Sequence, residues 1–318
     1  IFLLHAKRSY KVTAIFPNLT QRNQSELPSL SVCVPARNET DELNGCIRSI
    51  LSSDYPKLEV LVIDDCSQDN TSEIIKKFAH RGVRFIAGKT PPESWLAKNY
   101  AYHQLLDEAG GKLVLFCGTD VRFEPNSFRL MTGALLQNHK KMISILPTRK
   151  DTSFEHFLLQ PMRYWRELAI PKLFDKTPPV LSTCWMAERT FLNETGGFAA
   201  HKKTVRPERI ISRSAALSNN YAFIRSTSGY GISSIKKLRA QWDTAKRTRY
   251  PEHHNRPENV MISSLILAFT MLGSGVALAM SIFYAQYFAA GLALISIVFL
   301  LITHFIVNQT SGSTRKLI

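Results

Sequence analysis

Three short apolar runs of this chain each lead to residues that can bind a cation or a phosphate. The acidic residues that follow these runs are Glu39, Asp64, Asp65 and Asp120. Short apolar runs closed by turn residues are typical of strands buried on both faces. The carboxyl ends of parallel strands meet at one edge of a sheet, where open α/β proteins bind their ligands. Asp120 alone could simply cap a turn, but three converging strand ends favour a metal or phosphate site.

The elements that must position these carboxylates alternate between strand and helix. We expect strands at residues 30–35, 58–63, 83–86, 113–116 and 142–146. We expect helices at about residues 41–52, 71–78, 96–109 and 124–136. Asn38 or Thr40 could provide the N-cap of the first helix. This alternation predicts an α/β fold with a mostly parallel sheet and helices on both faces.

The composition excludes several classes of protein. The five cysteines are scattered and form no C-x-x-C pair, which argues against a disulfide framework and a zinc site and favours a reducing compartment. Neither G-x-G-x-x-G after the first strand nor G-x-x-x-x-G-K-[ST] occurs, which argues against a dinucleotide-dependent enzyme. No aromatic-rich or finger motif indicates a nucleic-acid partner. The net charge of +15 suits a membrane surface or an anionic nucleotide diphosphate.

A membrane-spanning region is expected near the end of the sequence. Residues 259–314 contain no Lys, Arg, Asp or Glu, which is enough for two spans of about 20 residues each. The apolar stretches lie at about residues 260–282 and 288–307, and basic residues flank them on their outer sides. This pattern predicts an integral membrane protein with a helical hairpin whose two ends, and the domain that precedes it, are cytoplasmic.

The expected organisation has five parts. They are a basic N-terminal segment and linker (1–28), a catalytic domain (29–234), a basic juxtamembrane segment (235–258), two transmembrane helices (259–308) and a tail (309–318). Residues 1–4 fit either the end of a membrane helix or a floppy terminus. Residues 154–174 carry aromatic and Arg side chains at helical spacing, which fits either a helix in the bilayer interface or packing against the sheet.

The motifs at the first, second and fourth strands resemble a known enzyme family. Residues 31–39 (Ser-Val-Cys-Val-Pro-Ala-Arg-Asn-Glu), 60–71 (Val-Leu-Val-Ile-Asp-Asp-Cys-Ser-Gln-Asp-Asn-Thr) and 113–120 resemble the nucleotide-binding half of inverting family 2 glycosyltransferases of the GT-A fold. Residues 95–99 (Trp-Leu-Ala-Lys-Asn) resemble a Trp-x-Gly-Lys segment of the membrane subgroup associated with hopanoid and carotenoid glycosylation. Residues 195–198 resemble the Gly-Gly-Phe turn that precedes the acceptor site.

This resemblance implies a set of donor-binding residues. They are Ala36, Arg37, Glu39, Asp64, Asp65, Lys98, Thr119, Asp120 and Trp242. The first three would line the nucleoside pocket, and Asp65 would contact the base or ribose while Asp64 supports the turn. Lys98 would face the diphosphate or the sugar. Asp120 would bind Mg²⁺ or Mn²⁺, because these cations prefer oxygen ligands.

The chain departs from the family pattern at two motifs. Gly118 stands where the D-x-D motif has its first carboxylate, so Asp120 is the only acidic residue of that motif. Pro207-Glu208 replaces the usual Glu-Asp pair, which makes Glu208 the candidate general base for an inverting transfer. The alternative is that Glu208 is an inert surface residue paired with Arg206 and Arg209. Trp242 could close over the diphosphate or serve only as an interfacial anchor.

Two functions remain after these comparisons of motifs. The first is a membrane-bound glycosyltransferase that moves a sugar from a nucleotide-diphosphate sugar, expected to be a UDP-sugar, to a lipid or lipid-linked acceptor with inversion. The second is a catalytically weakened relative that binds nucleotide sugar or membrane as a partner or scaffold. The losses at Gly118 and at the base motif favour the second function, and the intact nucleotide-binding motifs favour the first.

Overall fold

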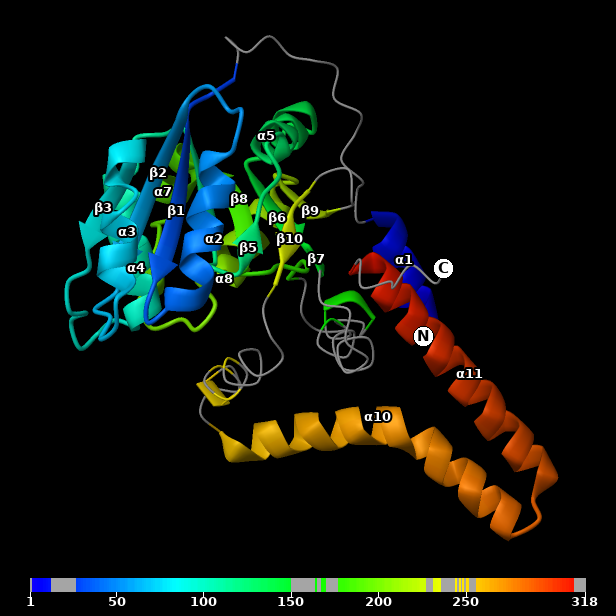
Figure 1. The fold of residues 1–318 in the computed structure, drawn as a ribbon. Helices are drawn as coiled ribbons and strands as arrows, with labels where there is room; N and C mark the ends of the chain where they lie inside the picture. Colours follow the sequence, from blue (N-terminus) through cyan, green and yellow to red (C-terminus); the bar gives the residue numbers. More distant parts are fainter. Residues whose placement is uncertain are drawn as a thin grey trace. The chain divides into compact units, whose positions relative to one another are not determined.

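The computed structural model of this protein describes residues 2–12, 27–149, 177–226, 231–235 and 256–311, and a few single residues between them. The chain separates into two compact units. One unit comprises Thr13–Asp151 and Lys172–Lys236, and the other comprises Ile1–Val12, Thr152–Pro171 and Lys237–Ile318. The first unit carries the sheet and every described residue of the candidate site, and the second carries the long apolar helices (Figure 1).

The first unit is built on a seven-stranded sheet in the order β3-β2-β1-β4-β8-β6-β9. Its strands are β1 (Leu30–Ala36), β2 (Leu58–Asp64), β3 (Val83–Ala87), β4 (Leu113–Cys117), β6 (Met142–Leu146), β8 (Cys184–Glu188) and β9 (Tyr221–Arg225). The pairs that join β1, β2, β3 and β4 are parallel, whereas β8 is antiparallel to both β4 and β6. The predicted mostly parallel α/β sheet is confirmed, and β8 and β9 are additions that the sequence patterns did not predict.

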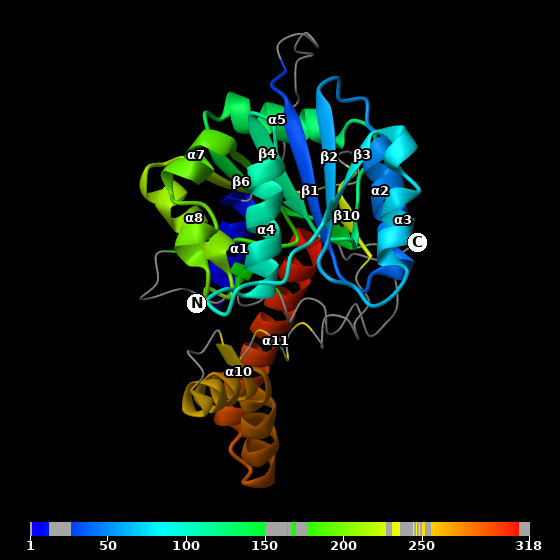
Figure 2. The ribbon, with the colours of Figure 1, turned by 90° about the vertical axis from the view of Figure 1, so that its left-hand side faces the viewer.

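Helices cover both faces of this sheet. The helices α2 (Thr40–Leu51), α3 (Thr71–Lys76) and α5 (Ser127–Gln137) share one apolar core with the sheet. On the other face, α4 (Ala97–Glu108), α7 (Arg189–Glu194) and α8 (Pro207–Leu217) share a second core (Figure 2). Apolar side chains of α2 recur three and four residues apart and are buried, as expected for an amphipathic helix. The sheet that carries the candidate site is therefore buried between two layers of helices, one on each face.

The start of α2 differs from the prediction. The helix begins at Thr40, and Glu39 occupies the N-cap position without a side-chain capping hydrogen bond. Asn38 has a left-handed backbone with φ of 54°, and its side-chain oxygen instead accepts a hydrogen bond from the Gln68 backbone. The predicted caps, Asn38 and Thr40, are therefore wrong, because Asn38 serves a contact between two loops.

A second, three-stranded sheet lies within the same unit. Its order is β5-β10-β7, and its strands are β5 (Val121–Arg122), β10 (Ser233–Ser234) and β7 (Thr148–Arg149). The strand β5 begins directly after Asp120, and β10 pairs antiparallel to β5 and parallel to β7. This small sheet therefore brings together three segments that are far apart in the sequence. They meet beside Asp120, which lies in the turn between β4 and β5.

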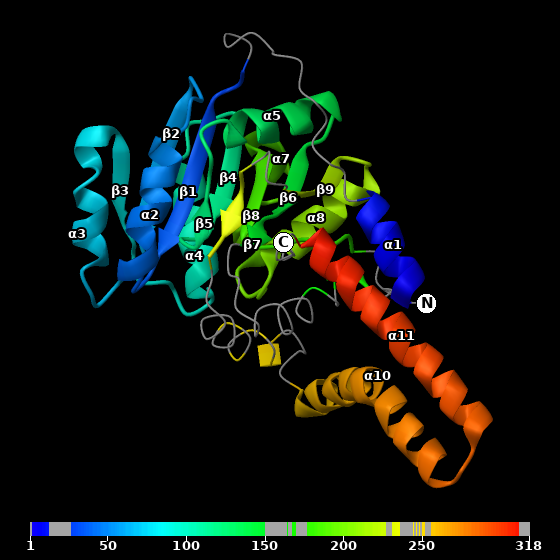
Figure 3. The same ribbon diagram turned by 45° about the vertical axis from the view of Figure 1, so that its right-hand side comes forward.

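The second unit contains three described helices. They are α1 (Phe2–Val12), α10 (Pro257–Phe283) and α11 (Tyr287–Thr310). Helix α1 lies beside the C-terminal half of α11 (Figure 3), so the alternative of a floppy terminus is wrong for residues 2–12. The two long helices form a hairpin, and a hydrogen bond of 2.8 Å joins the hydroxyls of Ser274 and Ser296.

The described residues of the expected membrane region contain one helix that has both the length and the apolar composition of a span. Among the described residues, α11 is long and apolar enough to cross a membrane, and the apolar stretch of α10, Leu272–Phe283, is shorter. Most of the predicted interfacial segment 154–174 and of the basic segment 235–258 lies outside the described residues, as does Trp242.

Candidate active site

The loops that follow β1 and β2 form one hydrogen-bonded wall at the edge of the sheet. Their register is direct, because Ala36 pairs with Asp64 at the ends of the two strands. Four hydrogen bonds join the loops: Asp65 N to Ala36 O (2.8 Å), Asn38 N to Ser67 Oγ (3.0 Å), Gln68 N to Asn38 Oδ1 (2.9 Å) and Glu39 N to Thr71 Oγ1 (3.0 Å). The predicted nucleoside-binding residues of the two loops therefore lie together in a preformed arrangement.

Asp64 and Asp65 have different surroundings in this wall. Asp64 accepts hydrogen bonds at both carboxylate oxygens, from the Ser67 backbone at 3.0 Å and from the Ser72 hydroxyl. Asp65 lies 3.8 Å from the Arg37 guanidinium. Burial raises the pKa of Asp65, and Arg37 opposes that rise while Asp64 adds to it. The hydrogen bonds of Asp64 therefore hold the turn, whereas Asp65 faces the Arg37 guanidinium.

Asp120 follows the end of β4 and is half-buried. The parallel register between β1 and β4 pairs Cys33 with Phe116, so the carboxyl ends of the two strands lie at the same edge of the sheet. The Oδ2 atom of Asp120 accepts a hydrogen bond from the Ser234 hydroxyl. The predicted convergence of Asp120 with the ends of β1 and β2 is thus a consequence of strand pairing.

The fit of a divalent cation depends on Asp120. Among the described residues, no group of three or more His, Cys, Asp or Glu side chains is placed to hold a metal ion. Mg²⁺ and Mn²⁺ sites that also use substrate phosphates need only one or two carboxylates, because phosphate oxygens and water complete the ligand set. Asp120 fits that kind of site, because its Oδ1 atom receives no hydrogen bond within the described chain.

Tyr102 is a neighbour of the predicted diphosphate residue Lys98, and it was not among the residues predicted from the sequence. The ammonium group of the exposed Lys98 lies 5.3 Å from the centre of the buried Tyr102 ring. Burial first, and then the charges of Glu208, two buried cysteines and Asp120, raise the pKa of Tyr102. Of the predicted site residues, Lys98 therefore lies over this ring, and the charges of Glu208 and Asp120 act on the Tyr102 hydroxyl.

Glu208 is fully buried at the start of α8. Its exposed fraction is 0%, and neither carboxylate oxygen has a hydrogen-bond partner among the described residues. The nearest cation is Arg206, whose Nε atom lies 3.5 Å from Oε1. The alternative is wrong about the surface location, because Glu208 lies within the core, but Glu208 is paired with Arg206 as that alternative expected. A carboxylate in the first turn of a helix faces the positive end of the helix dipole.

A loop held by α4 leads to Glu208. The Asn99 side chain donates hydrogen bonds to the carbonyls of His201, Lys202 and Thr204, at 2.9, 3.1 and 2.8 Å. The Leu96 backbone also donates to Lys202 O at 3.0 Å. Asn99 belongs to the Trp95–Asn99 motif, which was the available signal for it. These bonds fix the backbone that precedes α8.

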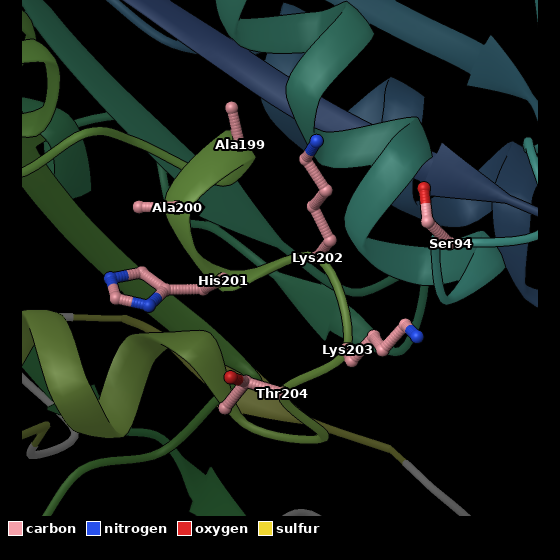
Figure 4. A pocket seen from close by; sticks show the side chains of 7 residues that line it. All are labelled: Ser94, Ala199, Ala200, His201, Lys202, Lys203 and Thr204. Carbon is pink, nitrogen blue, oxygen red and sulfur yellow. The ribbon is translucent and has the colours of Figure 1, made fainter.

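A shallow hollow of about 410 Å³ lies on this loop (Figure 4). It is lined by Ser94 and by residues 199–204, and Figure 4 shows the side chains of Lys202 and Lys203 pointing in different directions. The Lys202 ammonium lies 5.5 Å from the centre of the Trp95 ring. Burial lowers the pKa of His201 below its ordinary value. The hollow is thus bordered by basic and small polar groups.

The family of the chain follows from a match over the same segments. Residues 31–196, more than half of the chain, match the model of glycosyl transferase family 2. The chain belongs to glycosyl transferase family 2. The matched region contains the β1 and β2 loops, the Trp95–Asn99 motif and Asp120, and it ends before Glu208. The family is therefore established by the donor side of the site.

Individual family 2 relatives are distant. The chain is 32% identical over 100 residues to glycosyltransferase AglE of Haloferax volcanii, a match that covers 30% of this chain and 32% of AglE. It is 24% identical over 220 residues to the Escherichia coli UDP-Glc:alpha-D-GlcNAc-diphosphoundecaprenol beta-1,3-glucosyltransferase WfgD, covering 67% of this chain and 84% of WfgD. The chain spans about a third of the length of the first curated relatives that it matches.

A solved structure shares the fold over nearly the whole chain. The mannosyltransferase PcManGT from Pyrobaculum calidifontis, in complex with GDP-Man and Mn²⁺, aligns with a TM-score of 0.58 and 16% sequence identity. The alignment covers 98% of this chain and 94% of PcManGT. At this identity the likeness establishes the GT-A type of fold, and it leaves the residues of the site to be argued from this chain.

Proposed function

We propose that this protein is a membrane-bound glycosyltransferase that transfers a sugar, with inversion, from a nucleotide-diphosphate sugar to a lipid or lipid-linked acceptor. The observation that carries the proposal is Glu208, a buried carboxylate without a hydrogen-bond partner among the described residues. A buried carboxylate without hydrogen bonds is costly to fold even with the Arg206 guanidinium 3.5 Å away, so its presence in a family 2 chain favours a chemical role.

The part of the proposal that concerns the sugar donor is supported by the loops after β1 and β2, which four hydrogen bonds join. Ala36, Arg37 and Glu39 from the β1 loop, and Asp65 from the β2 loop, would bind the nucleoside. Thr119 and Lys98 would lie at the diphosphate and sugar, where the exposed Lys98 supplies a positive charge. We propose UDP as the nucleotide, and GDP is the competing candidate because PcManGT was solved with GDP-Man.

The transfer that we propose needs one base and one leaving group. Glu208 takes the proton of the acceptor hydroxyl, and the acceptor oxygen forms a bond to the anomeric carbon of the sugar. The bond between that carbon and the diphosphate oxygen breaks, and its electron pair leaves with the nucleoside diphosphate. Attack opposite the leaving group inverts the anomeric centre. Lys98 lowers the cost of the negative charge on the diphosphate.

Asp120 is the residue that we propose as the ligand of Mg²⁺ or Mn²⁺. A bound divalent cation would add positive charge beside the departing diphosphate. The PcManGT complex contains Mn²⁺, which makes Mn²⁺ the first cation to test. Chelation of divalent cations is expected to remove activity if this assignment holds.

The acceptor and the membrane location rest on two observations. Helix α11 has the length and the apolar composition of a span. The relatives include 4,4'-diaponeurosporenoate glycosyltransferase of Staphylococcus haemolyticus, 27% identical over 129 residues, and WfgD, whose name specifies a diphosphoundecaprenol acceptor. We therefore propose a lipid or lipid-linked acceptor and a cytoplasmic catalytic unit on an integral membrane protein.

A second candidate is a weakened relative that binds nucleotide sugar or membrane as a partner or scaffold. Gly118 favours it, because this position lacks the first carboxylate of the D-x-D motif. A protein of this kind would bind a nucleoside diphosphate but release none from a sugar donor.

The test compares Glu208→Gln with wild type in membranes. Release of nucleoside diphosphate from a panel of UDP- and GDP-sugars, in the presence of a lipid extract, measures transfer. Loss of a general base is expected to lower the rate by about 10²–10⁴-fold while nucleotide binding is kept. The matched control is Glu194→Gln, which changes an exposed side chain at the end of α7.

The two outcomes separate the candidate functions. Turnover by wild type that persists in Glu208→Gln would exclude Glu208 as the base. Binding of UDP or GDP by wild type without any turnover across the donor panel would favour the scaffold function instead.

A further inference from the structure

Asp120 is the end of a buried hydrogen-bond chain that starts outside the main sheet. The Arg149 guanidinium donates from Nη1 to the Ser234 hydroxyl oxygen at 2.9 Å. The Ser234 hydroxyl in turn donates to Oδ2 of Asp120. Ser234 is 0% exposed and Arg149 is 7% exposed, so water has little access to either. The chain therefore connects an arginine to the candidate cation ligand through one serine.

The backbone of the three-stranded sheet holds these residues in register. Ser234 pairs with Val121 on β5 and with Arg149 on β7. The Ile235 backbone also donates to the carbonyl of Asp120 at 3.0 Å. Because strand pairing fixes both neighbours of Ser234, its side chain has little freedom to leave Asp120.

The direction of each hydrogen bond follows from the chemistry of the groups. A guanidinium can only donate, and an ionised carboxylate can only accept. A hydroxyl has one proton and two lone pairs, so Arg149 occupies a lone pair of Ser234 and directs its proton toward Asp120. Oδ2 is thereby engaged, and Oδ1 is the oxygen that remains for a ligand.

Gly118 makes room for this orientation of Asp120. A Cβ atom added at Gly118 would lie only 2.7 Å from Oδ1 of Asp120. Real Cβ atoms do not approach an oxygen so closely, so any other residue at this position would push the Asp120 carboxylate aside. The absence of a side chain at Gly118 thus leaves space for the Asp120 carboxylate in the orientation that contacts Ser234.

We propose that Ser234 and Arg149 are positioning residues that hold Asp120 as a single-carboxylate ligand for the divalent cation of the nucleotide donor. This inference rests on the proposed function. Residues that hydrogen-bond to a metal ligand commonly contribute 10–100-fold to metal affinity because they fix its orientation. In this chain they replace the support that a second acidic residue would otherwise provide.

The test is the affinity of the full-length protein for UDP and for GDP, measured by calorimetry with saturating Mn²⁺ and again with excess EDTA. Ser234→Ala removes the hydroxyl that contacts Asp120. It is expected to weaken Mn²⁺-dependent nucleotide binding by about tenfold and to leave binding in EDTA unchanged.

The matched control is Ser233→Ala. Ser233 is the preceding residue of β10, is 1% exposed, and has a hydroxyl without a hydrogen-bond partner among the described residues. This variant changes the same strand by the same atom and is expected to bind Mn²⁺ and nucleotide as wild type does. A general loosening of β10 would weaken Mn²⁺-dependent binding in both variants. Weaker binding by Ser234→Ala alone would therefore report the loss of the hydrogen bond to Asp120.

Gly118→Ala provides a second, independent variant. It leaves Ser234 intact but is expected to displace Oδ1, so it should also weaken Mn²⁺-dependent binding. Because both changes act on one carboxylate, the double variant Gly118→Ala with Ser234→Ala should lose less Mn²⁺-dependent binding free energy than the two single variants lose in sum.

The outcomes distinguish this inference from the proposed function. Equal Mn²⁺-dependent affinities for Ser234→Ala, Ser233→Ala and wild type would overturn the role of Ser234. A wild-type protein that binds neither UDP nor GDP with Mn²⁺ would overturn the proposed donor class and the positioning role with it. A tenfold loss confined to Ser234→Ala and Gly118→Ala supports the inference.

Discussion

Two carboxylates of the candidate site, the half-buried Asp120 and the fully buried Glu208, are stabilised to different degrees by their surroundings. Asp120 receives a hydrogen bond from Ser234, whereas Glu208 has only Arg206 at 3.5 Å and the start of α8. A buried carboxylate without hydrogen bonds costs free energy of folding, and a nearby cation and a helix N-terminus offset part of that cost. The Asp120 carboxylate is thus held in place by a hydrogen bond, whereas the Glu208 carboxylate has none among the described residues.

A third carboxylate, Glu59, lies at the opposite end of the sheet and stabilises the fold. Burial alone would raise the pKa of Glu59, but hydrogen bonds from Ser31, Gly110 and Arg84 together hold it below its ordinary value of 4.5. A carboxyl with a lowered folded-state pKa stabilises the protein above the unfolded-state pKa, and this contribution is lost as the pH falls through the folded-state value.

Glu59→Gln is therefore expected to lower the melting temperature near neutral pH. The difference from wild type should shrink between about pH 6 and about pH 3, because the wild-type carboxylate loses its advantage as it is protonated. Thermal unfolding followed by circular dichroism measures this, with Glu73→Gln on the exposed side of α3 as the control. A difference that stays constant over this pH range would contradict the assigned role of Glu59.

At the scale of elements, α4 holds the loop that leads to Glu208. Successive residues on its first two turns have separate tasks, since Lys98 is exposed, Asn99 is buried against the loop at residues 201–204, and Tyr102 is packed in the core. The same loop leads directly into α8, which carries Glu208. The position of the candidate base therefore depends on a helix that precedes it by about a hundred residues.

Asn99→Ala is expected to destabilise the protein by about 1–3 kcal/mol, because three carbonyls lose a buried donor. Glycosyl transfer should fall further than nucleotide binding, since the loop before Glu208 loosens while the β1 and β2 loops stay intact. Chemical denaturation and transfer assays measure both effects.

Asn138→Ala is the control for this prediction. It removes one partly exposed hydrogen bond of 2.7 Å to Ala134 O at the end of α5. Equal losses of transfer in the two variants would show that the contacts of Asn99 have no particular importance for the site.

At the scale of the whole molecule, the chain combines a soluble type of unit with an apolar hairpin. The exposed side chains of α10 and α11 are largely apolar, and they include Leu265, Phe269, Phe288, Ile295 and Leu301. Apolar surface of this extent is unfavourable in water and is expected to face lipid. The last two turns of α11 differ, because Thr303, Asn308 and Thr310 are buried.

The full-length protein is expected to stay with membranes after washing with alkaline carbonate. The double variant Ile295→Asp with Leu301→Asp should shift protein to the supernatant, because each Asp near the centre of a span costs about 2.5–3.5 kcal/mol. Immunoblotting of the pellet and supernatant measures the distribution.

Leu217→Asp serves as the control, because Leu217 is an equally exposed apolar residue on α8 of the other unit. Release of the wild-type protein by carbonate would contradict integration of α11 into the bilayer.

The sequence by itself determined the elements with strong local patterns and the family. Apolar runs that end at acidic residues identified β1, β2 and β4, and the charge-free region identified α10 and α11. These features depend on residues close together in the chain, where periodicity and turn chemistry act directly. The Pro-Ala-Arg-Asn-Glu and Asp-Asp motifs identified the loops after β1 and β2 for the same reason.

Only the tertiary structure decided how the remaining residues of the site meet. Glu208 reads from its neighbours as a surface residue between two arginines, but packing of α8 onto the sheet buries it. Ser234 and Arg149 lie on two-residue strands too short to leave a periodic pattern, and they reach Asp120 only because β10 pairs with both β5 and β7. Contacts of this kind join residues more than eighty positions apart, and they arise from the packing of the whole unit, which leaves no local signal in the sequence.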